Sequence, residues 1–267
     1  MERLKEIERS IIKKYRKEIW SKYVKGVKEF EMIKENDKIA VCISGGKDSF
    51  LLAKCMQELL RHKKFHYELE FIVMNPGYNE ENIIKIKENL KILGIDAHIF
   101  DTPIFDVADK TDNPCYLCAR MRRGYLYSYA QKLGCNKIAL GHHFDDVIET
   151  ILMNILYTGN YASMMPKLHS DNFKGMELIR PLYFVREKDI KSWAKYNGLE
   201  FIDCACSVTK KKIGKRQEVK ELVQKLKEIY KEADKCIFAS SFNVNLNTVI
   251  GYKKGNEKYT FMDDYDM

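Results

Sequence analysis

The sequence contains no long apolar run and no strongly biased segment. In a chain of 267 residues, no stretch approaches the about 20 consecutive apolar residues that span a bilayer, which predicts no membrane association. Met1 to Lys17 is highly charged and lacks the apolar core and cleavage site of a secretion signal, so we expect a cytoplasmic protein. Internal repeats, low-complexity tracts and long linkers are also absent. With 45% hydrophobic residues, the chain can bury one sizeable core with an appendage, or form two small domains.

The eight cysteines are not expected to form structural disulfides, because the cytosol keeps thiols reduced. Four of them stand alone in apolar or helical sequence and are interpreted as small buried hydrophobic residues. These are Cys42, Cys55, Cys135 and Cys236. The other four form the clusters Cys115-x-x-Cys118 and Cys204-x-Cys206. These clusters are the candidates for catalysis or metal binding.

Positive charge is concentrated in three runs of a chain with a formal net charge of +8. One lies in the first helical segment, one follows Cys118, and one lies shortly after Cys206. A single basic run is usually a solvated surface, but three together favour a phosphate-rich partner. The residues that would contact such a partner, which is RNA if the family resemblance given below holds, are Lys13, Lys14, Arg16, Lys17, Arg123, Lys210, Lys211, Lys212, Lys215 and Arg216.

Short apolar, β-rich runs alternate with segments of helical periodicity, which predicts an α/β protein with a doubly wound parallel sheet. The expected strands are residues 37–43, 68–74, 96–102, 136–140 and 199–203. The expected helices are residues 48–63, 79–93, 118–133, 144–157 and 186–197, flanked by amphipathic helices at 3–31 and 217–235. We therefore expect a basic helical extension at 1–34, an α/β domain at 35–206, and a helical extension with a tail at 207–267.

Unusual residues follow the end of each expected strand. The carboxyl ends of parallel strands border the crevice where α/β proteins bind ligands, so these segments should meet in one crevice. The segment "SGGKDS", Ser44 to Ser49, lies between a strand and a helix. Gly45 and Gly46 permit a tight turn with exposed N–H groups, and the helix N-terminus favours an anion. The segment predicts a pyrophosphate cradle, although a simple strand-to-helix turn can also use two glycines, and the loop resembles the PP-loop of ATP pyrophosphatases. The candidate ATP-binding residues are Ser44, Gly45, Gly46, Lys47, Asp48, Ser49, Gly141 and His142.

The segment "GHHFDDVIET", Gly141 to Thr150, repeats the change from strand to helix. Its carboxylates, Asp145 and Asp146, are candidates for holding Mg²⁺ beside a triphosphate. Helix capping by an aspartate is the alternative interpretation. For His142, backbone positioning or polar packing is at least as well supported as proton transfer.

The four clustered cysteines are compatible with three kinds of site. A C-x-x-C pair at the start of a helix can be a redox dithiol, since the helix end lowers a thiol pKa. Four thiolates suit structural zinc. Three can instead hold an iron–sulfur cluster with one open iron, and spacing alone does not separate these last two. Proximity to the expected nucleotide crevice favours a site that takes part in chemistry.

The motifs "CYLCARMRRGYLY", "KIALGHHFDDVIET", "MMPKL" and "IRPLYFVREKDI" occur in that order along the chain. Together they resemble the tRNA 2-thiocytidine synthetase family (TtcA-like), part of the PP-loop ATP pyrophosphatase superfamily of iron–sulfur-dependent tRNA thiolation enzymes. The similarity extends from near Lys14 to beyond Arg216. Related enzymes that act on uridines carry additional zinc-finger cysteines near their termini, and this sequence has none.

This resemblance implies a [4Fe–4S] cluster held by Cys115, Cys118 and Cys206, with Cys204 as the rival third ligand. It implies that ATP and Mg²⁺ activate the 2-oxygen of an anticodon-loop cytidine and that sulfur then replaces it. In this scheme Asp48, Asp145 and Asp146 serve the ATP chemistry, while Arg122 stabilises developing charge or binds phosphate. The expected partners are tRNA and a sulfur donor, either a cysteine desulfurase or free sulfide, with a homodimer suggested.

Three alternatives remain open from the sequence. The same chemistry can act on a uridine. A PP-loop enzyme resembling a lysidine synthetase would use ATP but not the thiols. A non-enzymatic iron–sulfur or zinc RNA-binding module would not turn over ATP.

Overall fold

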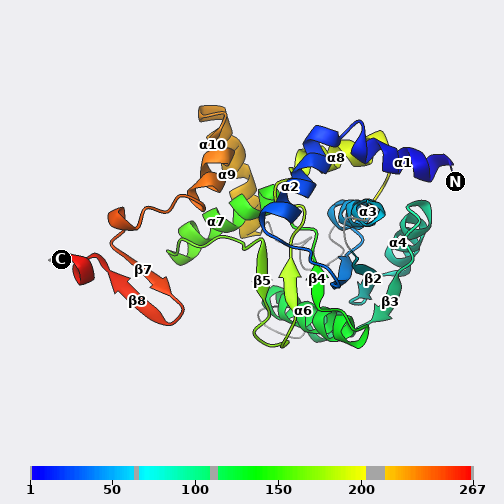
Figure 1. Cartoon of the computed structure of the whole chain (residues 1–267), viewed down its shortest axis with the longest axis horizontal. Helices are drawn as coiled ribbons and strands as arrows, with labels where there is room; N and C mark the ends of the chain where they lie inside the picture. Colours follow the sequence, from blue (N-terminus) through cyan, green and yellow to red (C-terminus); the bar gives the residue numbers. More distant parts are fainter. Residues whose placement is uncertain (1, 63–65, 109–113, 203–213, 266–267) are drawn as a thin grey trace.

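A six-stranded sheet forms the centre of the computed structural model, which describes residues 2–62, 66–108, 114–202 and 214–265 (Figure 1). The strands are β1 (Lys38–Ile43), β2 (Glu68–Asn75), β3 (His98–Asp101), β4 (Lys137–Ala139), β5 (Lys167–His169) and β6 (Glu177–Ile179). Their spatial order is β3-β2-β1-β4-β6-β5. All neighbours pair in parallel except β5, which is antiparallel to β6. The predicted parallel sheet is confirmed, except that its edge strand β5 is antiparallel.

Helices cover both faces of this sheet, as a doubly wound fold requires. Alternate residues of β1 point to opposite faces. Ile39 and Val41 belong to the larger buried cluster, while Ala40 and Cys42 belong to a smaller one on the other face. The smaller cluster is covered by α6 (Pro114–Lys132), which lies on the opposite side of the sheet from α3 (Lys47–Arg61) (Figure 1).

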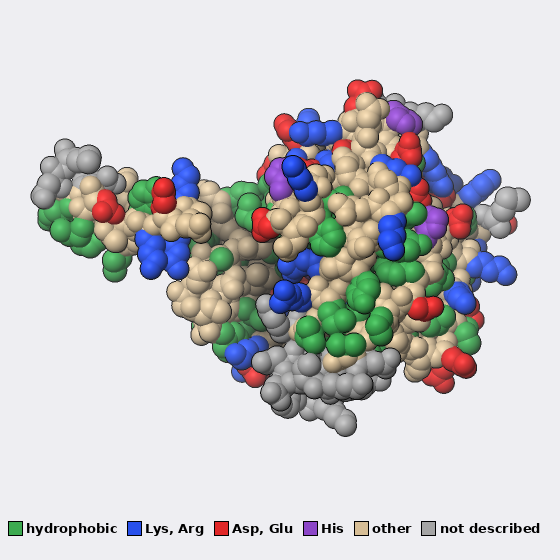
Figure 2. Space-filling view, turned by 90° about the horizontal axis from the view of Figure 1, so that it is seen from below, with side chains coloured by type: hydrophobic (Ala, Val, Ile, Leu, Met, Phe, Trp, Pro, Cys, Tyr) green, Lys and Arg blue, Asp and Glu red, His purple; other side chains and the backbone are tan. Residues whose placement is uncertain are grey.

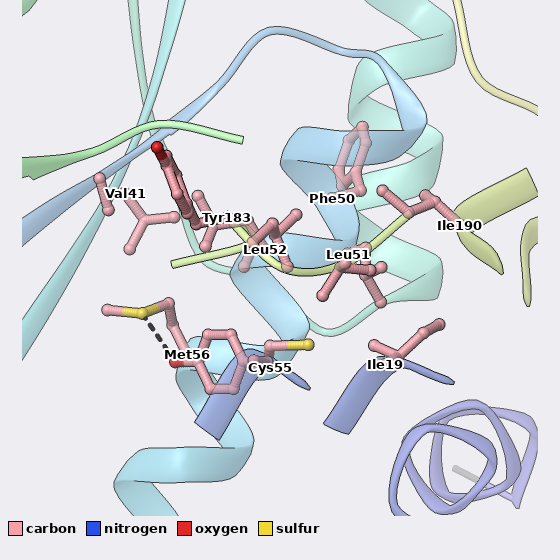
Figure 3. Packing of buried hydrophobic residues seen from close by; sticks show 14 of the residues in the cluster. Ile19, Val41, Phe50, Leu51, Leu52, Cys55, Met56, Tyr183 and Ile190 are labelled. Carbon is pink, nitrogen blue, oxygen red and sulfur yellow. Dashed lines mark hydrogen bonds between the residues drawn. The ribbon is translucent and has the colours of Figure 1, made fainter. Parts of the chain in front are cut away.

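The larger cluster is built around α3. Its residues Phe50, Leu51 and Leu52 are completely buried and pack near Ile19 and Ile190 (Figure 3). Ile190 belongs to α8 (Glu187–Tyr196), which contacts α3 directly. This packing fixes the start of α3, and hence the preceding loop, against the rest of the molecule.

Most predicted helices are confirmed with small shifts of their ends. In addition to α3, α6 and α8, the structure has α4 (Glu80–Ile92) and α7 (Phe144–Thr158) where helices were expected. It also contains a short helix, α5 (Ile104–Ala108), that was not predicted. Of the isolated cysteines, Cys42, Cys55 and Cys135 are buried as expected. Cys236 is exposed, so that part of the prediction was wrong.

Three predicted elements were wrong in detail. Residues 199–202 form no strand, and β6 occupies the position beside β4 instead. The expected helix 3–31 is divided into α1 (Glu2–Ile12), the π-helical turn η1 (Arg16–Trp20) and α2 (Ser21–Glu29). The expected helix 217–235 is divided into α9 (Lys215–Ile229) and α10 (Ala233–Ser240), because the chain turns between Tyr230 and Glu232.

The N-terminal segment is part of the main core. Its apolar stripe, including Ile7, Ile11, Ile19 and Tyr23, is buried in the larger cluster. The expected boundary after residue 34 stays a prediction, as does the boundary after residue 206.

A C-terminal arm projects from the body of the molecule (Figures 1 and 2). It comprises residues 241–265 and includes η2 (Leu246–Thr248), the hairpin β7 (Gly251–Lys254) and β8 (Glu257–Thr260), and η3 (Phe261–Asp264). Every residue of the hairpin except Tyr259 is exposed. Within the described residues, the structure has no helix that is both long enough and apolar enough to cross a membrane.

Candidate functional site

The loop between β1 and α3 is closed by its own serines and glycines. Gly46 is the residue before α3, and Gly45 has a φ of +89°, a conformation that side chains rarely adopt. A Cβ on Gly45 would lie 2.5 Å from Cδ1 of Ile202, so the loop also has no space there for a side chain. The Ser49 hydroxyl accepts from the Ser44 N–H at 3.1 Å and donates to the Gly46 carbonyl at 2.8 Å. The result is a compact turn at a helix N-terminus, which is suited to binding an anion.

The loop between β4 and α7 lies directly against this turn. A Cβ on Gly141 would be 3.0 Å from the backbone of Asp48 and Ser49. The loop ends in a capping box, in which the His143 N–H donates to Asp146 Oδ2 at 2.9 Å and the Asp146 N–H donates to His143 Nδ1 at 3.4 Å. The two predicted motifs are therefore adjacent at the carboxyl edge of the sheet.

Two cavities open at this edge. One, of about 720 Å³, lies between the β1–α3 loop and the end of α8 and is lined partly by Lys47, Lys191 and Phe201. The other, of about 420 Å³, lies between the two loops and α6. Both are lined by Ser44, Asp48, Tyr78 and Arg122. Two ligands, one bound in each cavity, would therefore meet beside these shared residues.

Arg122 reaches both cavities from α6. Its guanidinium lies 5.6 Å from the centre of the Phe105 ring, and its Nε is buried without a hydrogen-bond partner among the described residues. A buried donor without a partner is costly, which indicates that a ligand acceptor completes the site. Arg123, the next residue, lines the smaller cavity and is exposed.

Carboxylates surround the imidazole of His143. Its nitrogens lie 3.7 Å from Asp48 Oδ1, 3.8 Å from Asp145 Oδ2 and 3.4 Å from Asp146 Oδ2. Although burial opposes ionisation of Asp146, the nearby charges of His143 and Arg216 lower its pKa. Of these three carboxylates, Asp146 is thereby favoured in its ionised form in the folded protein.

Asp145 and Asp146 have structural partners as well. Asp145 Oδ2 accepts from the Glu187 N–H at 2.7 Å, and Asp146 Oδ1 pairs with Arg216 at 3.2 Å. Within the described part of the chain, no three His, Cys, Asp or Glu side chains are arranged to hold a metal by themselves. Asp48 Oδ1, however, is buried with no hydrogen-bond partner among those residues. One or two carboxylates together with substrate phosphates is the usual site for Mg²⁺, so these residues fit that ion.

The sequence did not identify several residues of this site. Arg216 Nε bonds Glu149 at 2.9 Å, and Arg180 Nε donates to His142 Nδ1 at 3.2 Å. Burial, opposed by the charge of Asp146, lowers the pKa of His142 to about 4, so its ring is neutral at pH 7. Burial similarly lowers the pKa of Arg180 to about 10. Glu149 lies in the segment Gly141 to Thr150 that the sequence singled out, whereas Arg180 does not stand out, because it belongs to no glycine-rich loop.

The candidate sulfur-site and RNA-contacting residues are placed only in part. Cys115 and Cys118 are three positions apart in the first turns of α6, and such positions share one helix face. Cys204, Cys206, Lys210, Lys211 and Lys212 lie outside the described residues. Lys13, Lys14, Arg16, Lys17, Lys215 and Arg216 are exposed. Lys14 Nζ lies over the Tyr196 ring and Lys215 Nζ over the Tyr157 ring.

The sheet and its glycine loop define a PP-loop protein, and a family model described as PP-loop domain matches residues 15–226. The chain is 39% identical over 208 residues to the tRNA-cytidine(32) 2-sulfurtransferase of Syntrophotalea carbinolica, covering 76% of this chain and 80% of that one. It is 38% identical to the protein of that name from Geobacter metallireducens, covering 80% and 84% of the two chains. The chain therefore belongs to the family of tRNA-cytidine(32) 2-sulfurtransferases within the PP-loop proteins.

A solved structure supports the fold. The chain is similar to the U34-tRNA thiolase NcsA from Methanococcus maripaludis, solved with its [4Fe–4S] cluster. The TM-score is 0.67 with 23% identity, and the match covers 89% of this chain and 84% of that chain. At this identity the similarity concerns the arrangement of the sheet and helices.

Proposed function

We propose that this chain is an ATP-dependent tRNA sulfurtransferase that converts an anticodon-loop cytidine to 2-thiocytidine. The observation that carries the proposal is the course of α6. This helix begins with Cys115 and Cys118 and, one turn further on, brings Arg122 into the wall of both cavities beside the PP-loop. A sulfur site and an ATP site are thereby joined by one rigid element, as the reaction named for the sulfurtransferase relatives requires.

The first half of the reaction is activation of the base by ATP. The Ser44–Ser49 turn binds the β- and γ-phosphates through its N–H groups, and Lys47 adds a positive charge. The 2-oxygen of the cytidine attacks the α-phosphate, and pyrophosphate leaves. Arg122 stabilises the negative charge at the α-phosphate, because its buried Nε lacks another partner among the described residues. Asp48 with Asp145 or Asp146 would hold Mg²⁺, which would shield the phosphate charges.

The second half replaces the activated oxygen, with AMP as the leaving group. The α6 cysteines fit an iron–sulfur ligand set, since a helix N-terminus favours thiolates and their spacing is one turn. Cys206, or Cys204, completes this set in the proposal. A [4Fe–4S] cluster bound there would supply the sulfur that replaces the oxygen. Free sulfide, or the persulfide of a cysteine desulfurase together with a two-electron reductant, would renew that sulfur.

Exposed basic residues bind the tRNA backbone in this proposal. Lys13, Lys14, Arg16, Lys17 and Arg123 are exposed, and Arg123 also lines the smaller cavity. Such contacts give affinity that falls with salt rather than base choice. A homodimer is also part of the proposal, and it would be tested by the mass of the anaerobic protein in solution.

The test begins with protein purified without oxygen. Iron, sulfide and zinc are measured for the wild type, Cys204→Ala, Cys206→Ala and the control Cys236→Ala, which removes an exposed cysteine on α10. We expect about four irons and four sulfides, lost in Cys206→Ala only. Nucleosides from tRNA treated with this protein, ATP and a sulfur source should then contain 2-thiocytidine.

Two results would overturn the proposal. Stoichiometric zinc that requires both Cys204 and Cys206, with no sulfide after anaerobic reconstitution, would exclude the sulfur-transfer mechanism. Full activity of Cys115→Ala in an ATP-dependent tRNA modification without sulfur would instead indicate the lysidine synthetase-like alternative. Thiolated uridine in place of 2-thiocytidine would correct the choice of base alone.

A further inference from the structure

Glu187, the first residue of α8, lies among three lysines from different elements. Its Oε1 is 3.1 Å from Nζ of Lys47 in the PP-loop and 3.2 Å from Nζ of Lys191 in α8. Its Oε2 is 2.6 Å from Nζ of Lys220 in α9. The side chain of Glu187 is only 13% exposed. One carboxylate therefore connects the ATP-binding loop to two helices.

The position of this carboxylate is fixed by the backbone. The Glu187 N–H donates to Asp145 Oδ2, and the Phe144 N–H donates to the Val185 carbonyl at 2.9 Å. Further along α8, Ile190 and Trp193 are completely buried in the main core. The Glu187 carboxylate thus projects from an anchored point of the backbone, where the three lysine ammonium groups meet it.

Lys47 has two carboxylates within reach. Its Nζ lies 3.1 Å from Asp48 Oδ2 as well as 3.1 Å from Glu187 Oε1. Without Glu187, the nearest anion to Lys47 among the described residues would be Asp48, its neighbour in sequence. A tight Lys47–Asp48 pair would neutralise both groups and withdraw the positive charge from a bound triphosphate.

We propose that Glu187 is a positioning residue for ATP: it holds the Lys47 ammonium in place for the phosphates and, through Lys220, makes this placement depend on α9. The proposal rests on the proposed use of ATP. A purely structural role, in which Glu187 only joins α8 to α9, would affect stability without acting through Lys47.

A double-mutant cycle on nucleotide affinity separates these roles. The cluster-loaded protein is titrated with a non-hydrolysable ATP analogue, α,β-methylene ATP, and Mg²⁺ in a calorimeter. We expect Glu187→Gln to weaken binding about tenfold, and to have no further effect when Lys47 is already changed to Gln. The control is Asp189→Asn, two residues along α8, which has the same 13% exposure and an ion pair with Lys22 outside the site.

The link to α9 is tested by Lys220→Gln. This change should weaken analogue binding by about threefold in the wild type and have no effect in the Glu187→Gln background. Thermal unfolding of each variant shows whether the fold persists. The proposal is overturned if Glu187→Gln weakens binding equally with and without Lys47, or if it lowers only the unfolding temperature.

These outcomes are distinct from failure of the proposed function. If the analogue binds and the cycle shows coupling while no 2-thiocytidine is made, only the proposed reaction is wrong. If 2-thiocytidine is made and the cycle shows no coupling, only the role of Glu187 is wrong.

Discussion

Gly141 lies where the two strand-to-helix loops touch. Because its hypothetical Cβ would be 3.0 Å from the backbone of Asp48 and Ser49, a methyl group must push the start of α3. Backbone atoms cannot move aside as a flexible side chain can. The close approach of the two loops therefore depends on the absence of a side chain at Gly141.

Gly141→Ala should weaken ATP binding by at least about tenfold and cost on the order of 1–3 kcal/mol of stability, as overpacking does. Calorimetric titration with an ATP analogue and urea unfolding measure the two effects. Gly124→Ala on α6 is the matched control, since a Cβ there meets nothing within 4 Å and alanine favours a helix by about 1 kcal/mol. Equal ATP affinity in the two variants would contradict the prediction.

Glu187 also gives a prediction about acid stability. Although burial raises its pKa, the bond from Lys220 and the charge of Lys47 bring that pKa down to about 2 from an ordinary value of 4.5. A carboxyl whose pKa is lowered by folding stabilises the protein above pH 4.5, and this contribution is lost as the pH falls through 2. In urea unfolding of cluster-free protein, the stability difference between wild type and Glu187→Gln should therefore shrink over this range. A pH-independent difference would refute this assignment.

At this scale, short motifs predicted which loops form the candidate site but not how its side chains are held. Ser44, Gly45 and Gly141 stood out because turns and anion cradles demand their residue types. Glu187 and Arg180 looked like ordinary charged residues. Their roles depend on side chains that come close to them only in the folded chain, and no local spacing encodes those contacts.

At the scale of secondary-structure elements, a buried ion pair joins the N-terminal helix α1 to α3. Lys54 is 1% exposed, and its Nζ contacts Glu8 Oε1 at 2.7 Å and the Leu93 carbonyl at 2.8 Å. Glu8 Oε1 also accepts from Arg61 at 2.7 Å. Removing one partner of a buried pair leaves a charge without compensation, which is costlier than removing an exposed pair.

We expect Glu8→Gln to lower the free energy of unfolding by about 3 kcal/mol, because Lys54 keeps its buried charge. Lys54→Met, which replaces the charge with an apolar chain, should cost less. Glu29→Gln on α2 is the control, since its pair with Lys25 is exposed and should contribute under about 1 kcal/mol. Urea unfolding ranks the three variants. A Glu8→Gln cost no larger than that of Glu29→Gln would show that Lys54 finds another anion.

Residues 199–202 show why one strand prediction failed. Their apolar pattern predicts a strand, yet these side chains pack against helices instead. Phe201 stacks with Phe50 at 5.3 Å and with Trp193 at 6.5 Å between ring centres, and the Glu200 carbonyl accepts from Asn89 at 2.8 Å. Alternation of apolar and polar residues shows that one side of a segment is buried. Whether the segment joins a sheet depends on pairing partners that are distant in sequence. The three-residue strand β6 was too short for periodicity to reveal.

Across the whole molecule, the body and the C-terminal arm differ in how they are stabilised. The body has buried apolar clusters on both faces of the sheet. The arm contains a short hairpin, and apolar residues beside it, Ile250, Phe261 and Met262, are exposed. The PP-loop match ends at residue 226, before the arm begins. Isolated two-stranded hairpins are marginally stable in water.

Deleting residues 243–267 should therefore leave the unfolding of the body unchanged within about 0.5 kcal/mol, because no side chain of the main core is removed. The measurement is chemical unfolding of the truncated and full-length proteins, followed by tryptophan emission from Trp20 and Trp193. Deleting α1 at residues 2–12 gives the contrast, since Ile7 and Ile11 belong to the core. A large loss on removing the arm would mean that it supports the body.

The arm also makes the native protein unevenly vulnerable to proteases. Lys253, Lys254 and Lys258 are exposed on a hairpin that opens without disturbing the body, so the free energy needed for cleavage there is small. Trypsin should release C-terminal peptides while the sheet and its crevice stay whole. The digest would separate the nucleotide-binding body from its appendage without any change to the gene.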